Sequence, residues 1–186
     1  MPKMIGYQEQ VDGLVLIGEV TASGVGTLSM DIPAGYHTME FHYYNMHPAT
    51  NQVDFMFQVN AVGQSGFNET ITSAAFTSSH FGDDTTLFRI EPDDDQAQGT
   101  GYQTLVSAVG SGADESCAGI LHLFTPSNTT FVTHFYARFI CHGGSSDVAQ
   151  EEYVSGYINI TSAVDEISFK VDSGNFDGVI QMYGIA

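Results

Sequence analysis

The chain has 186 residues, and its 4 basic residues are outnumbered by 22 acidic ones, giving a formal net charge of −18. That balance excludes proteins that bind nucleic acid or anionic membranes, because both partners must be neutralised by clustered Lys and Arg. No apolar run reaches about 18 residues, so no membrane-spanning helix is predicted and no membrane insertion is expected.

The first stretch, residues 1–13, contains one Lys and no apolar core of a secretory signal. It is predicted to be an N-terminal arm, and the protein is expected to fold in the cytosol where it is made. The remainder, residues 14–186, shows no composition shift or internal repeat and is predicted to be one domain.

Apolar residues alternate with polar ones along most of the chain, which is the period of half-buried strands. Turn-forming Gly, Asn, Asp, Ser and Pro clusters separate the runs. In chain order the predicted strands are Leu14–Ile17, Val25–Met30, His37–Tyr43, Val53–Val59, Glu69–Phe76, Thr86–Ile90, Tyr102–Val109, Cys117–Phe124, Thr130–Cys141 and Glu152–Ile160, followed by a terminal pair.

The terminal pair consists of residues 167–171 and 179–183 on either side of the turn Asp172–Asn175. This pattern predicts a β-hairpin. The inward side chains are predicted to be Ile167, Phe169, Val179 and Tyr183.

Helical spacing is not seen in any window, so little helix is expected. About eleven strands, within a range of roughly 10–12, predict an all-β protein. The expected architecture is an antiparallel β-sandwich of jelly-roll type with polar loops at its ends.

Three patterns in the sequence bear on metal binding or catalysis. Asp93, Asp94 and Asp95 are weak candidates for Ca²⁺ binding, although a solvated acidic loop is favoured because no EF-hand spacing is present. The seven histidines match no metal motif. No Gly-x-Ser-x-Gly elbow occurs and no acid pair is singled out, so no active site, metal or cofactor is predicted.

Cys117 and Cys141 lie in separate predicted strands. Free thiols are favoured in a reducing cytosol. A disulfide between adjacent strands remains the alternative.

Two motifs carry a resemblance to a known family. One is N-x-H-P-x-T-x-x-V-x-F, matched from Asn45 to Phe55; the other is T-S-A-x-D-x-I-x-F-K with S-G-N-x-D…Y-G, matched at Thr161–Lys170 and Ser173–Gly184. These segments resemble a family of bacteriophage structural proteins common in marine and cyanobacterial phages. The loop at Asn60–Gly66 departs from the family's D-G-G-S-S-Y tip. The resemblance implies a virion component with a β-sandwich fold and no enzymatic activity, made in the host bacterial cytoplasm.

Three functions follow from this resemblance and the composition. The first is an accessory component on the outside of the particle, associated with a tail fibre or baseplate or acting as an adhesion module for host-surface glycans. Weak candidates for binding are Tyr43, Tyr44, Tyr102, Tyr136 and Tyr153, through ring stacking. The second is a capsid decoration (cement) protein, and a distant third is a glycan-degrading enzyme.

Other virion proteins, of the tail or the major capsid, are the expected partners. A homo-oligomer is also expected, with a trimer favoured, because virion sites impose rotational symmetry.

Overall fold

The computed structural model describes residues 13–144 and 147–186, so the predicted N-terminal arm lies outside the described residues except for Gly13. The described chain is all-β and contains no helix, which confirms the predicted fold class. No helix in these ranges is long and apolar enough to cross a membrane. The strands are β1 Val15–Val25, β2 Thr27–Asp31, β3 Thr38–Pro48, β4 Val53–Ala61, β5 Ile71–His80, β6 Thr86–Ile90, β7 Ala97–Gly99, β8 Gln103–Val109, β9 Cys117–Phe124, β10 Thr133–Gly143, β11 Val148–Ile158, β12 Val164–Val171 and β13 Phe176–Ile185.

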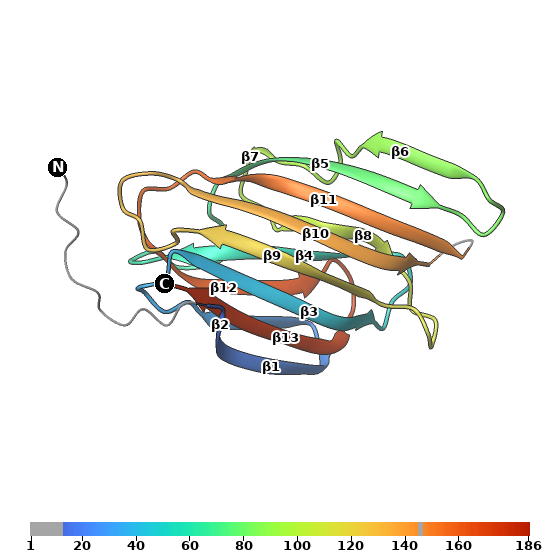
Figure 1. Cartoon of the computed structure of the whole chain (residues 1–186), viewed down its shortest axis with the longest axis horizontal. Helices are drawn as coiled ribbons and strands as arrows, with labels where there is room; N and C mark the ends of the chain where they lie inside the picture. Colours follow the sequence, from blue (N-terminus) through green and yellow to red (C-terminus); the bar gives the residue numbers. More distant parts are fainter. Residues whose placement is uncertain (1–12, 145–146) are drawn as a thin grey trace.

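The strands form two layers (Figure 1). The large sheet has the order β1-β13-β3-β9-β10-β11-β5, and both β6 and β7 pair with the far edge of β5. The small sheet has the order β2-β12-β4-β8. One antiparallel pair, Gly143 with Val109, links the layers at a corner between β10 and β8.

The two sheets enclose a core dominated by aromatic rings. Phe41 and Tyr43 of β3 meet Phe169 of β12 with ring centroids 5.7 and 5.4 Å apart. Phe57 of β4 meets Phe135 of β10 at 5.2 Å. Each fully buried ring removes enough apolar surface from water to contribute about 1.5–3 kcal/mol, and edge-to-face pairs add to this. This contact between layers identifies the structure as a sandwich.

A β-bulge in β3 changes which side chains face the core. Asn45 has a φ of 50°, and the register of β3 shifts there against both of its neighbours. Tyr43 therefore points inward and Met46 also points inward, while Tyr44 between them is exposed. One extra residue on one strand produces this reversal.

The terminal strands do not form the predicted hairpin. β12 pairs with β4 and β2 in the small sheet, whereas β13 pairs with β3 and β1 in the large sheet. The turn between them crosses from one layer to the other, and Gly174 at its tip has a φ of 84°, a conformation that favours glycine. Alternation along a strand indicates which of its faces is buried, but it does not indicate which strand pairs with it. The sequence pattern therefore could not distinguish a hairpin, whose two strands pair in one sheet, from an arch, whose two strands lie in different sheets.

The predicted inward side chains of this region are correct on one strand and wrong on the other. Ile167 and Phe169 are fully buried. On β13 the buried residues are Phe176, Ile180, Met182 and Gly184, while Val179 and Tyr183 lie on the face opposite to Ile180 and Met182 and are only half-buried. Both alternating sets of β13 are apolar, so the sequence pattern does not decide between them.

Of the thirteen strands in the described residues, the sequence pattern did not predict one and gave shorter bounds for several others. β7 lies in the stretch predicted as a polar loop, where it pairs with Ile71 and Thr72 of β5. Its three residues, Ala-Gln-Gly, are too few to show a periodic pattern.

Candidate functional site

The outward side of the large sheet, called the outer face below, carries an unusual set of exposed side chains. Residues directly opposite on antiparallel strands point to the same face, and the registers place distant parts of the chain in common rows. One row runs through Gln181, His42, Ile120, Arg138, Tyr153, Phe76 and Ile90. The next row runs through Tyr183, Glu40, His122, Tyr136, Ser155 and Ala74.

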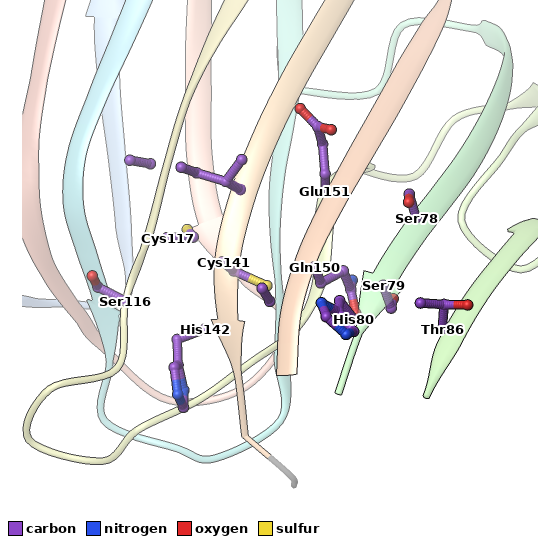
Figure 2. Close-up of a pocket in the computed structure, with 13 residues that line it drawn as sticks. Ser78, Ser79, His80, Thr86, Ser116, Cys117, Cys141, His142, Gln150 and Glu151 are labelled. Atoms are coloured by element: carbon purple, nitrogen blue, oxygen red, sulfur yellow. The ribbon is translucent and has the colours of Figure 1, made fainter. Parts of the chain in front are cut away.

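Two adjoining hollows cross the strands on this side of the molecule. The larger is about 680 Å³ and extends from Ser116 to Thr86, as Figure 2 shows. The smaller is about 470 Å³ and is bounded by His42, Tyr44 and Arg138. Both hollows are lined by Ala118 and Ile140, so together they form one groove running across β3, β9, β10, β11 and β5. Small residues form part of its floor.

Aromatic rings and imidazoles stack along this face. His122 and Tyr136 stack with centroids 4.3 Å apart, and Phe76 stacks on Tyr153 at 4.8 Å. The guanidinium carbon of Arg138 lies 5.4 Å from the centre of the Tyr153 ring, and Arg138 also forms an ion pair with Glu151. These contacts hold planar side chains in fixed positions on an otherwise open surface.

Polar side chains around Glu40 form a linked network. The Nε2 atom of His42 lies 2.9 Å from Glu40 Oε2, and the Nδ1 atom of His122 lies 3.4 Å from Glu40 Oε1. Partial burial lowers the pKa of His122, and the neighbouring His42 lowers it further, against the opposite influence of Glu40. His122 is therefore neutral at physiological pH and able both to donate and to accept a hydrogen bond.

A second polar chain lies at the β13 end of the face. The Tyr183 hydroxyl donates to Gln181 Oε1 at 2.7 Å, and Gln181 Nε2 donates to Glu19 Oε2 at 2.7 Å. Such linked groups are already ordered before a ligand arrives, which reduces the entropy cost of binding.

The structure brings three of the five predicted binding tyrosines to this face. Tyr44 and Tyr136 are 42% and 43% exposed, and Tyr153 lies between them and Phe76. Tyr43 is 1% exposed in the aromatic core and cannot contact a ligand, so the prediction that it binds one is wrong. Tyr102 directly precedes β8 and packs on the small sheet, where its hydroxyl donates to Ser168 Oγ at 3.0 Å and Lys170 covers its ring.

Sequence reasoning missed several outer-face residues, above all Arg138, Ile140 and Phe76. Ile140 is 56% exposed at the centre of the groove. The sequence pattern that could have identified them is in the segment His134–His142. Its buried face carries Phe135, Ala137 and Phe139, and every second residue, on the opposite face, is large or basic. Which other strands lie beside that segment is decided only by the fold.

The predicted acidic loop does not behave as one unit. Asp93 is exposed, whereas Asp94 is half-buried and Gln103 Nε2 donates to its backbone oxygen at 2.6 Å. Within the described residues no group of three or more His, Cys, Asp or Glu side chains is arranged to hold a metal ion.

Asp94 instead lies near a buried carboxylate, Glu152. Glu152 is fully buried, and its Oε2 atom accepts hydrogen bonds from the backbone N–H and hydroxyl of Ser107 at 3.0 and 3.1 Å. Burial and the Asp94 charge raise the pKa of Glu152 to about 8, while burial and the Asp54 charge raise that of Asp94 to about 6. At neutral pH the Glu152 carboxyl group therefore holds a proton, because charge is costly in the interior.

The two cysteines are free and buried, although they sit directly opposite each other on β9 and β10. Burial raises the pKa of Cys117, and it raises that of Cys141 to about 12. Both thiols are therefore protonated and unreactive in the folded protein.

Comparison with known proteins gives little. No family model matches the chain, and no curated protein matches it. A solved structure, the crystal structure of infectious bursal disease virus VP2 subviral particle, aligns with all of this chain and 44% of that chain, at 13% identity and a TM-score of 0.16. The chain thus spans less than half the length of that protein, and a TM-score this low supports no inference about fold or function.

Proposed function

We propose that this chain is a non-enzymatic accessory component on the outside of a bacteriophage particle, and that it serves as an adhesion module. The observation that carries the proposal is the groove across the outer face, with its ordered rings and polar side chains. The resemblance of residues 45–55 and 161–184 to phage structural proteins supports a place in the virion.

The chemistry of the groove suits the glycans of a host surface. Sugar rings present apolar faces that stack on aromatic rings and hydroxyls that bond to planar polar groups. Tyr44 and Tyr136 offer rings on either side of the His42–Glu40–His122 network. The strongly acidic chain, at −18, favours a neutral ligand over an anionic one.

The arrangement of carboxylates supports binding without hydrolysis. A glycosidase needs two carboxyl groups that both reach the scissile bond. Asp94 and Glu152 are the pair with strongly raised pKa values, but Glu152 has no exposed surface. On the outer face, Glu40 contacts two histidines and Glu151 is paired with Arg138.

Binding can be tested with purified protein and surface polysaccharide from the host, by titration calorimetry. Tyr44→Ala and Tyr136→Ala together are expected to weaken binding at least about tenfold, the effect of losing roughly 1.4 kcal/mol. Tyr102→Ala is the matched control, because it removes an aromatic ring from the other sheet. Equal loss in the control, or release of reducing sugar by the wild type, would contradict an adhesion module without enzymatic activity.

A capsid decoration protein is the second candidate, and strand β6 favours it. Leu87, Phe88 and Ile90 are all strongly exposed at the edge of the large sheet, as expected of a surface that joins protein subunits. Locating the protein in an electron-microscopy map of the particle separates the two. Density on the tail supports adhesion, density at the local three-fold axes of the capsid supports decoration, and absence from purified particles defeats both.

A further inference from the structure

Strand β6 is an open edge of the large sheet. Among the described residues it pairs only with β5, and Figure 1 shows it at the far margin of the molecule. All five of its residues are exposed. An edge strand of this kind presents a row of unpaired backbone N–H and C=O groups, which is a template for a further strand.

β6 exposes large apolar side chains on both sides of the sheet. Phe88 and Ile90 share the outer face with Ser78 and Phe76, and they are 69% and 71% exposed. Leu87 lies on the opposite side and is 41% exposed, because the small sheet ends at β8, which lies against β10 and β11. A soluble protein seldom exposes such a strand unless a partner covers it.

Charge narrows the choice of partner. The segment Thr85–Ile90 contains no acidic residue, and its Arg89 forms an ion pair with Glu91 directly after the strand, so the strand is close to neutral. Two copies of a chain with a net charge of −18 repel each other over most of their surface. Within β6 itself two copies can approach without an acidic side chain of one strand facing the other, because the nearest acidic residues, Asp84 and Glu91, lie beyond its two ends.

We propose that β6 pairs antiparallel with β6 of a second copy, so that the large sheets of two chains continue into one another. An antiparallel pair of identical edges is related by a two-fold axis perpendicular to the sheet, and its contacts are self-complementary. Phe88, the central residue of the strand, then lies near the axis and packs against its equivalent. A trimer, which the sequence analysis favoured, would instead need two different edges to pair.

The pairing has a consequence for binding. A perpendicular two-fold axis leaves the outer faces of both copies on the same side of the continuous sheet. Two grooves facing one surface bind it with an avidity above that of either groove alone. The dimer itself does not depend on what the grooves bind.

Sedimentation of the whole protein at tens of micromolar tests the proposal. The wild type is expected at twice the 20.1 kDa chain mass, and Phe88→Glu is expected at the mass of one chain. Phe131→Glu is the matched control, because Phe131 is 68% exposed, similar to Phe88, but lies in the segment before β10. Far-ultraviolet circular dichroism establishes that each variant is folded.

A second measurement addresses the position of the axis. Under mild oxidation Phe88→Cys is expected to give a covalent dimer, whereas Phe131→Cys is not, and the native cysteines do not compete because both are buried. A monomeric or trimeric wild type would overturn the proposal, as would a dimer that survives Phe88→Glu. If the monomeric variant still binds polysaccharide, with lower avidity, then adhesion does not require the dimer. The proposed function and the proposed dimer can therefore fail independently of each other.

Discussion

The two faces of the large sheet differ in burial, and two pairs of consecutive residues show the difference. Tyr43 lies in the aromatic core while Tyr44 is 42% exposed on the outer face. Glu152 is fully buried while Glu151 is paired with Arg138 at the surface. In the interior these side chains are enclosed by packing, and Glu152 Oε2 is also hydrogen-bonded within the chain. The outer face keeps similar side chains ordered but open on one side, and it is therefore the part of the sheet able to bind something else.

The largest expected effect is on the core. Phe169→Ala removes a buried ring that contacts Phe41, Tyr43 and Phe55, and it should lower the free energy of unfolding by about 3–5 kcal/mol through lost transfer energy and a cavity. Denaturant unfolding measures this. Tyr136→Ala, on the outer face, should cost less than about 1 kcal/mol; similar losses in both variants would mean that the faces do not differ as described.

Buried Glu152 predicts a dependence of stability on pH. Its pKa is about 8 in the folded protein against 4.5 ordinarily. Below the lower value the carboxyl group is protonated in both states, and as pH rises the unfolded chain ionises first. The free energy of unfolding should therefore fall between about pH 4.5 and 8, by an amount on the order of a few kcal/mol, and then level off.

The matching substitutions separate Glu152 from its neighbour. Glu152→Gln should flatten most of this pH dependence, because the amide keeps the size and bonding of the protonated acid. Glu151→Gln should leave the dependence in place. Asp94, whose pKa is raised to about 6, should contribute the part that remains in the first variant. An unchanged pH profile in Glu152→Gln would refute the assignment.

A smaller effect on stability is expected to distinguish Tyr43 from Tyr44. The Tyr43 hydroxyl is buried and has no hydrogen-bond partner, so Tyr43→Phe should raise the free energy of unfolding by about 1 kcal/mol. Tyr44→Phe should change it by less than about 0.5 kcal/mol. Thermal melting of both variants provides the comparison, and destabilisation by Tyr43→Phe would show that the hydroxyl is satisfied.

The sequence was sufficient to predict most strands, because the alternation that marks a strand involves only residues that are adjacent in the chain. Period-two alternation, the absence of helical spacing and the turn residues predicted an all-β sandwich, and the bounds of β6 and β9 agree with the prediction. The same alternation correctly placed Met39, Phe41 and Tyr43 on one face of β3. It did not identify Tyr43 as unable to bind, because a face is assigned to the core only once a second sheet covers it.

Only the tertiary structure decided which strands lie next to each other. The terminal strands form an arch between layers because other strands occupy both edges of each. The outer-face groove joins His42 of β3 to Arg138 and Glu151 of the paired strands β10 and β11, which lie far from His42 in the chain and meet it only through the strand registers. Burial along a strand depends on a few adjacent residues, whereas strand order depends on the packing of the whole chain, and this is why the sequence by itself determined the fold class but not the candidate site.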